Sequence, residues 1–462
     1  MHYPWWHVPF LTSPMLIALI ATIHVLVAHY AVGGGIFLYW ETRHAYKLDR
    51  QDYLDYLKSH AWFFILLTVV FGAITGVGIW WTIGLASPLA TEQLIHTFVF
   101  GWAIEYVFFI LEIVAAFLFY YFWGKLSRRT HLAIGAIYAF SAWMSLVIIT
   151  GITAFMLNPG DWPENQTFWN GFFNPQFIPQ TLARTGGALL LASLYVYLHA
   201  AFRAKGELRD LLAKRSSRPA LLGAALVVAG GIGWYISLPE SAAAALEAAS
   251  ALNLMTLLIF ALTVVVFFML YLGPYRNPSW LSPGFAVLLF AAGLAAFASG
   301  EFIREAVRKP YVVYNVVYSN NIYPEEVPGL REKGYLEGGT WTNAWVRDNY
   351  PSAVNGDGAS ATIDENALTA LPAEDRQAVG KVLYQYHCSM CHAAEQGLSA
   401  TAHLVRGWDR EMIQSLVEKP NQFHFFMPPW AGTAEEAELL TDYLESIAPP
   451  PPGGMRQARE SE

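Results

Sequence analysis

The sequence predicts an all-α protein: a polytopic membrane helix bundle of about eight transmembrane helices, plus a small all-α domain outside the membrane. Of its 462 residues, 55% are hydrophobic and only 14% are charged, which is a membrane composition. Apolar runs long enough to cross a bilayer recur along the first two thirds of the chain. They stop near residue 306, and shorter runs with helical spacing follow.

Eight apolar runs define the predicted spans. They lie at residues 14–40, 60–86, 94–123, 131–157, 180–202, 218–238, 250–273 and 284–306. No basic segment flanks the first run and no small-residue cleavage site follows it, so we expect a retained helix rather than a signal peptide.

Basic residues in the connecting segments predict the orientation. The segments after the first, third, fifth and seventh runs hold fourteen Lys and Arg residues, and those after the second, fourth and sixth hold none. Since Lys and Arg gather on the cytoplasmic side, both termini should lie outside. We expect a multi-pass protein of the bacterial cytoplasmic membrane with its C-terminal domain in the periplasm.

The segment after the last span is neither apolar nor typical of a flexible linker. Residues 311–365 are rich in Tyr, Asn, Gly and Pro, and their aromatic content favours an ordered strap over the outer membrane face. The predicted domains are therefore a transmembrane domain at 1–310, the strap, a compact domain at 366–449 and a disordered tail at 450–462.

The motif Cys388-Ser389-Met390-Cys391-His392 predicts the chemistry of the compact domain. C-x-x-C-H attaches a c-type haem: each thiol adds across a vinyl group, and the His becomes an axial iron ligand. Cys388 and Cys391 are the only cysteines, which leaves none for a disulfide framework or a Cys-rich zinc site. Because c-type haem is attached on the outer side, this motif predicts the same side as the basic residues do.

Met427 is the predicted second axial ligand. A thioether is a soft ligand for haem iron, and Pro428 and Pro429 stiffen the loop that presents it. A helical pattern at 375–386 leads into the motif, and another follows at 434–447. This arrangement closely resembles a small class I cytochrome c domain, in which His392 and Met427 form the axial pair. Weaker candidates for ligands are Met390, His387, His403 and His424.

Ionisable and iron-binding side chains within the spans indicate a second redox site, because such groups are costly in a membrane. Nitrogen, sulfur and oxygen ligands suit haem iron, and Arg suits its propionates. The candidates are His24, His96, Glu105, Glu112, Arg184, Met255, Glu301 and Glu305. His96 is equally typical of an interfacial residue and Met255 of core packing. His29, on a different face from His24, is more typical of a hydrogen-bonded core residue.

The order of several motifs resembles cytochrome bd oxidase subunit I over about residues 10–315. These motifs are Ile20–His24, Glu41-Thr42, Ala103–Glu105, Leu111-Glu112, Trp123–Leu126, Met156–Pro159, Phe173–Pro175 and Glu305–Tyr311. The last is similar to the family signature Glu-x-Gly-Arg-Gln-Pro-Trp, with Val307, Lys309 and Tyr311 as departures.

The resemblance implies roles for four of the membrane candidates. His24 and Glu305 occupy the positions that ligate the two haems of the family's oxygen-reducing site. Glu105 and Glu112 match the paired carboxylates that serve the haem site and its proton supply, at a spacing of seven where the family has eight. We therefore expect haem b and/or haem d in the membrane domain, besides one covalent haem c.

Departures from the family pattern bear on electron entry. Arg184 stands where the family has the His ligand of its low-spin haem, and of that ligand pair Met255 remains alone. Arg184 and Arg308 are then suited to pair with haem propionates. The family's long quinol-binding loop is shortened here to about residues 239–250, and its final helix is replaced by the cytochrome. The usual route for electrons from quinol is therefore expected to be absent, and the sequence does not decide whether quinol is a partner.

Two functional classes follow. The favoured one is an electron-transfer subunit of a larger respiratory complex, passing electrons between membrane haem and the c-haem. The other is a terminal oxidase of the bd-like type, fed through its c-haem. A third interpretation is a haem-free membrane anchor for a cytochrome c. Expected partners are membrane lipid, other respiratory subunits and a soluble periplasmic cytochrome or redox protein, with no nucleic acid.

Overall fold

The computed structural model describes residues 4, 6–356 and 361–449. The predicted disordered tail, 450–462, lies outside the described residues. The chain forms two compact units. One is the membrane bundle, residues 20–80 and 92–308; the other, called here the cytochrome unit, comprises residues 1–19, 81–91 and 309–462.

Eight helices among the described residues are long and apolar enough to cross a membrane, which confirms the predicted fold class. Six of the spans contain single α-helices: α1 (Ser13–Leu48), α5 (Val99–Tyr121), α6 (Arg128–Ala154), α9 (Phe177–Arg203), α10 (Gly206–Ile236) and α13 (Pro283–Ala306). The second span joins α2 (Gln51–Ile65), the π-helix η1 (Leu66–Phe71) and α3 (Gly72–Ala86). The seventh joins α12 (Ser250–Leu270) and η2 (Tyr271–Tyr275).

Short elements connect the spans. They are α4 (Pro88–Thr97), α7 (Trp162–Asn165), α8 (Phe168–Phe172), α11 (Glu240–Ala248) and the 3₁₀-helix η3 (Pro278–Trp280). Phe98 has φ −120° and ψ 29°, which separates α4 from α5. The third span therefore begins at Val99 rather than near residue 94, and His96 belongs to α4.

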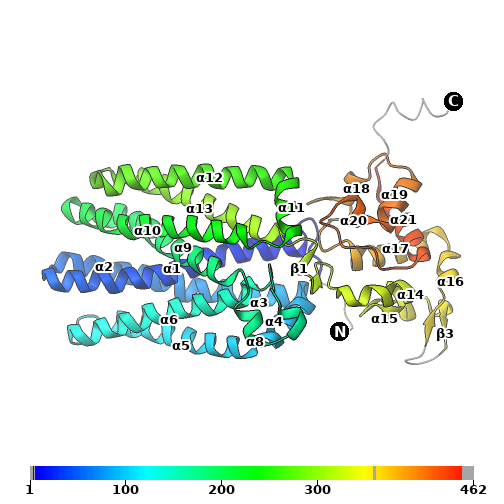
Figure 1. The fold of residues 1–462 in the computed structure, drawn as a ribbon, viewed down its shortest axis with the longest axis horizontal. Helices are drawn as coiled ribbons and strands as arrows, with labels where there is room; N and C mark the ends of the chain where they lie inside the picture. Colours follow the sequence, from blue (N-terminus) through cyan, green and yellow to red (C-terminus); the bar gives the residue numbers. More distant parts are fainter. Residues whose placement is uncertain (1–3, 5, 357–360, 450–462) are drawn as a thin grey trace. The chain divides into compact units, whose positions relative to one another are not determined.

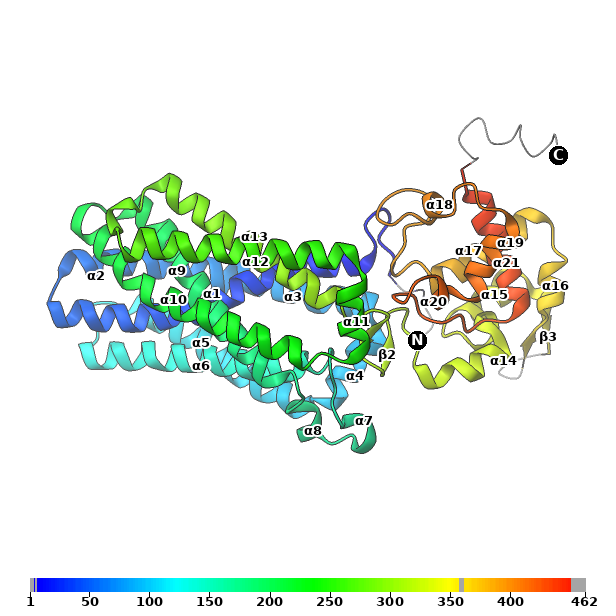
Figure 2. The same ribbon diagram turned by 45° about the horizontal axis from the view of Figure 1, so that its top comes forward.

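Helix α1 packs against three neighbours through consecutive glycines. A Cβ on Gly33 would lie 2.0 Å from the Ala188 carbonyl oxygen of α9. A Cβ on Gly34 would lie 2.7 Å from Phe64 of α2, and one on Gly35 2.1 Å from Tyr138 of α6. Small residues let helix backbones approach closely in a membrane. Both views place α5 and α6 on one side of α1, and α12 and α13 on the other (Figures 1 and 2).

The sixth span starts earlier than hydropathy predicts. Helix α10 begins at Gly206, twelve residues before the predicted start at 218. The prediction placed the start too late because the first three turns of the helix carry basic residues, which depress the hydropathy. At 1.5 Å per residue, its 31 residues extend about 46 Å, beyond a hydrocarbon core of about 30 Å.

The cytochrome unit is mostly helical. Its elements from residue 365 onward are α16 (Glu365–Thr369), α17 (Ala373–His387), α18 (Thr401–Leu404), α19 (Arg410–Glu418), α20 (Pro420–Phe423) and α21 (Ala434–Ile447). Helix α21 starts with a capping box in which Thr433 and Glu436 satisfy each other's backbone N–H groups. Helices α17 and α21 pack tightly, since a Cβ on Gly380 would lie 2.1 Å from the Leu439 carbonyl oxygen.

Residues 309–365 fold as part of this same unit. They form two antiparallel pairs, β1 (Tyr311–Val313) with β2 (Val317–Tyr318) and β3 (Val354–Asn355) with β4 (Thr362–Ile363). Between them lie η4 (Pro324–Glu326), α14 (Val327–Gly338), α15 (Thr342–Asn349) and η5 (Pro351–Ala353). The predicted strap is thus ordered where it is described; its position over the membrane face stays a prediction.

Segments from distant parts of the sequence complete the cytochrome unit. The Leu398 amide donates to the Phe10 carbonyl at 2.7 Å, and the Asn321 side-chain amide donates to the Ala86 carbonyl at 3.1 Å. The start of the first span, the end of the second and the segment after the eighth therefore belong to one folded unit. Two spans separate the first of these segments from the second, and six separate the second from the third, so an even number of spans lies between any two of them.

Candidate functional site: two regions suited to haem

The attachment motif lies at the end of α17. The helix ends at His387, and the amides of Cys391 and His392 both donate to the Cys388 carbonyl at 3.1 Å. This tight turn holds both thiols and the imidazole within five residues. Both cysteines are free and half-buried, as thioether formation to one porphyrin requires.

The His392 ring is oriented by the backbone. Its Nδ1–H donates to the Ser399 carbonyl at 2.9 Å, which fixes the tautomer and leaves Nε2 as the basic nitrogen. Burial lowers the pKa of His392, so the ring is neutral at physiological pH. A neutral imidazole with a fixed ring and an available Nε2 fits an axial haem ligand.

Met427 is presented by a turn. Its amide donates to the His424 carbonyl at 3.0 Å, and buried Pro428 follows. The Met427 side chain is half-buried. Two free thiols, an oriented imidazole and a thioether together fit a covalent c-type haem, which would supply one-electron redox chemistry.

Tyr335 of α14 connects the segment before the cytochrome fold to both halves of this site. Its hydroxyl donates to His387 Nδ1 at 2.7 Å and accepts from the Ala431 amide at 3.0 Å. Asn320 also donates to His387 Nδ1, at 3.2 Å. Burial lowers the pKa of His387 to about 4, so its ring stays neutral and accepts both bonds. His387 therefore serves as a structural acceptor in this arrangement.

The other weak candidates are placed as follows. Met390 is buried in the core of the cytochrome unit. His403 and His424 are exposed. His424 lies within electrostatic range of His392, as a residue at the haem edge would.

His24 lies at the close contact of α1 with α3. Its Nδ1 hydrogen-bonds the Thr75 hydroxyl at 3.1 Å, and a Cβ on Gly76 would lie 3.1 Å from His24 Cε1. The π-helix η1 ends immediately before this contact, and π-helical turns are frequent at functional sites. With Nδ1 engaged, Nε2 is the nitrogen that would bind an iron, so His24 fits the ligand role that the motif resemblance implies.

Glu105 and Glu112 are neighbours on α5 and interact electrostatically. The Ser145 hydroxyl of α6 donates to Glu105 at 2.6 Å, and Tyr138 of α6 lies within electrostatic range of Glu112. The Tyr138 hydroxyl donates onward to the Ala31 carbonyl of α1 at 3.1 Å. The two carboxylates therefore line the α5–α6 contact together with hydroxyl groups that can pass protons.

The end of α13 holds two ion pairs. Glu305 pairs with Arg308, whose side chain is only 3% exposed, and Glu301 pairs with Arg304 at 2.9 Å. Arg184 of α9 donates to the Thr150 hydroxyl at 3.2 Å and interacts with Glu301 and Arg304. Arg184 and Arg308, expected at propionates, thus already have protein partners.

Met255 and His96 are more exposed than the other membrane candidates or have fewer polar contacts. Met255 is half-buried on α12. The His96 side chain is 75% exposed and lies 4.0 Å from Glu92, one turn earlier on α4.

Two more histidines of the bundle are buried: His29, which the sequence indicated as a hydrogen-bonded core residue and whose Nδ1 bonds the Val25 carbonyl at 2.8 Å, and His60, which the sequence analysis missed. His29 is within electrostatic range of both Arg184 and Glu301, and its ring packs on Phe297 of α13 at 5.1 Å. His60 is fully buried, bonds the Tyr30 hydroxyl at 3.0 Å and packs 4.8 Å from the His199 ring. His60 stands at the start of a predicted apolar run, and its pairing with His199 depends on which helices pack together.

Comparison with known proteins identifies both regions. Residues 13–234 match the family model of cytochrome bd terminal oxidase subunit I, and residues 375–444 match that of cytochrome C oxidase, cbb3-type, subunit III. The bd oxidase from Geobacillus thermodenitrificans has a similar fold, with a TM-score of 0.56 and 16% identity over 65% of this chain and 87% of that one. A search of curated proteins found no match.

The chain thus contains a cytochrome bd oxidase subunit I domain and a C-terminal cytochrome c domain, as its motifs predicted. The two matches imply c-type haem in the C-terminal domain and haem in the membrane domain.

Proposed function

We propose that this fusion of a bd oxidase subunit I domain with a cytochrome c domain transfers single electrons between membrane haem and a c-haem on the outer face. The reduced donor haem loses one electron and the acceptor haem iron goes from Fe(III) to Fe(II). We infer that the chain does this as a subunit of a larger respiratory complex in the bacterial cytoplasmic membrane.

One observation carries the proposal. Arg184, at the position of the family's low-spin haem ligand, bonds Thr150 and interacts with Glu301 and Arg304. An Arg with such partners is no iron ligand, so the usual relay from quinol through a low-spin haem lacks one of its ligands. The c-haem site, whose His392 is oriented by Ser399, offers a replacement point for electron entry or exit.

A second candidate function is oxygen reduction fed through the c-haem. It is favoured by the paired carboxylates Glu105 and Glu112, which lie among the hydroxyls of Ser145 and Tyr138. Oxygen reduction consumes protons as well as electrons, and a carboxylate pair of this kind suits proton delivery.

Oxygen uptake by the purified chain, measured with two donors, tests both candidates. An oxidase fed through the c-haem consumes oxygen with a reduced c-type cytochrome and little with quinol. A relay subunit consumes oxygen with neither donor, although its haems equilibrate rapidly. Robust uptake driven by quinol would contradict both versions.

A further inference from the structure

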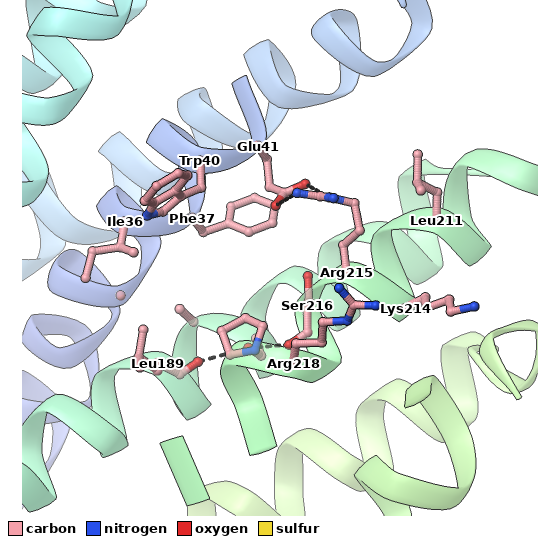
Figure 3. A pocket seen from close by; sticks show the side chains of 14 residues that line it. Ile36, Phe37, Trp40, Glu41, Leu189, Leu211, Lys214, Arg215, Ser216 and Arg218 are labelled. Carbon is pink, nitrogen blue, oxygen red and sulfur yellow. Dashed lines mark hydrogen bonds and ion pairs between the residues drawn. The ribbon is translucent and has the colours of Figure 1, made fainter. Parts of the chain in front are cut away.

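A cavity of about 360 Å³ opens between α1, α9 and α10 (Figure 3). Its apolar walls come mainly from α1 and α9 and include Ile36, Phe37, Trp40 and Leu189. Its polar side comes from one turn and a half of α10, which supplies Lys214, Arg215, Ser216 and Arg218. The cavity is thus amphipathic, with hydrocarbon on one side and cations on the other.

The charges around the cavity do not balance. Glu41 is the acidic residue among those that line it, and Arg215 satisfies it through two N–H groups while the Tyr53 hydroxyl donates to the same carboxylate. Lys214 and Arg218 are exposed, and no carboxylate of the described chain lies within ion-pair distance of either. Three cations against one anion leave an excess of two positive charges, and Arg43 stacks over the Trp40 ring close by.

A buried hydroxyl also faces the cavity without a partner. Ser216 is 2% exposed and lines the cavity, and its Oγ has no hydrogen bond within the described structure. Its carbonyl, in contrast, accepts from the Ser193 hydroxyl at 3.0 Å. An unsatisfied buried hydroxyl costs about 1–3 kcal/mol, so a ligand that hydrogen-bonds Ser216 gains that stabilisation.

Helix lengths place the cavity at the edge of the membrane. Lys214, Arg215 and Arg218 lie in the first thirteen residues of α10, the part that extends beyond the hydrocarbon core. Glu41 and Trp40 lie within nine residues of the end of α1. A half-exposed Trp at this level is typical of the membrane interface. The apolar walls therefore face acyl chains, and the cations lie at the level of the headgroups.

We propose that this cavity binds one anionic phospholipid. Lys214 and Arg218 hold its phosphodiester, the Ser216 hydroxyl donates to a headgroup oxygen, and the acyl chains run along Ile36, Phe37 and Leu189. Basic pockets between transmembrane helices on the cytoplasmic side suit such headgroups. The net charge of the cavity separates this ligand from a zwitterionic lipid, which carries no net charge to neutralise it.

Native mass spectrometry of the full holoprotein, delipidated in detergent, tests the proposal. Phosphatidylglycerol and phosphatidylcholine with the same acyl chains are titrated separately. We expect the first to bind at a single site with at least tenfold preference. The double variant Lys214→Gln/Arg218→Gln should bind phosphatidylglycerol roughly 30-fold more weakly, since each cation near anionic lipid contributes about fivefold.

The matched control is Lys125→Gln/Arg129→Gln, which removes two exposed cations predicted on the same side but absent from the cavity lining. It should bind phosphatidylglycerol as the wild type does. A further arm adds inorganic phosphate, which should not displace the lipid, because it lacks the acyl chains that contact the apolar walls. Equal binding of the two lipids, an equal loss in the control variant, or displacement by phosphate would each overturn the proposal. Unchanged haem spectra of both variants confirm that each is folded.

Discussion

The cytochrome unit and the membrane bundle hold their candidate ligands in different ways. In the cytochrome unit, Cys388, Cys391 and His392 lie in one turn, and a backbone carbonyl orients the imidazole. In the bundle, the candidates are spread over several helices, and groups such as Glu105 and Arg184 already have protein partners. The first site depends on local sequence and the second on helix packing. Substitutions in the cytochrome unit should therefore affect its haem site alone, whereas substitutions in the bundle should also disturb the packing of neighbouring helices.

The largest expected effect is the complete loss of covalent haem. Replacing both cysteines, Cys388→Ser/Cys391→Ser, removes the two thioether bonds, so haem staining of the denatured chain should disappear. Because the membrane site uses other residues, its absorbance should remain. If membrane haem is lost as well, the two regions are not independent and the comparison above fails.

His24→Ala should give the reciprocal result. It removes the imidazole at the α1–α3 contact, so non-c absorbance in the pyridine haemochrome spectrum should fall while the c-haem persists. His29→Gln is the matched control on the same helix and should retain both signals, since His29 packs among Arg184, Glu301 and Phe297. Full retention of membrane haem in His24→Ala would contradict the assignment and make His96 the next candidate.

Met427→Ala should leave the haem attached but change its coordination. Without the thioether, the red charge-transfer band of the oxidised protein should vanish, and the reduction potential should fall, because His/Met ligation raises it. Met390→Leu, in the same domain, should preserve both properties. Persistence of the band in Met427→Ala would exclude this Met as the ligand.

Glu436 should make the stability of the cytochrome unit depend on pH. Its carboxyl lies fully buried beside Glu365, and burial raises its pKa to about 8. The folded state then binds a proton that the unfolded state releases above its ordinary pKa of about 4.3. Stability should therefore fall as pH rises from about 4.5 to 8 and level off above.

The measurement is the thermal midpoint of the c-haem Soret band in the full chain across this range. Glu436→Gln carries no titratable proton, so its profile should be flatter than that of the wild type. Parallel profiles would show that Glu436 is not the titrating group.

Tyr335→Phe should have the smallest effect. It deletes the hydroxyl that joins His387 to Ala431 and leaves a buried amide without a partner, a cost of roughly 1–3 kcal/mol. The same Soret melt measures it, with Tyr443→Phe as control, because the Tyr443 hydroxyl has no hydrogen bond among the described residues. Equal thermal midpoints of the two variants would show that the Tyr335 hydroxyl does not stabilise the cytochrome unit.

The sequence was sufficient for features set by local chemistry. C-x-x-C-H has a defined spacing, and the eight apolar runs match the eight candidate spans. The sequence failed to predict the start of α10, because Lys214 and Arg215 lower the hydropathy of the first turns of this helix. It also missed contacts between residues far apart, such as Tyr335 with Glu436 and Arg184 with Glu301, since these depend on which helices are neighbours.

The central claim is that electrons pass between the c-haem and membrane haem of one chain. Stopped-flow mixing of the oxidised holoprotein with a reduced c-type cytochrome, without quinol and under nitrogen, tests it most directly. We predict that the c-haem is reduced first and the membrane haem follows, and that His392→Ala abolishes both phases while retaining the membrane haem. Reduction of the c-haem with no change at the membrane haem, or unimpaired membrane-haem reduction in His392→Ala, would contradict the account.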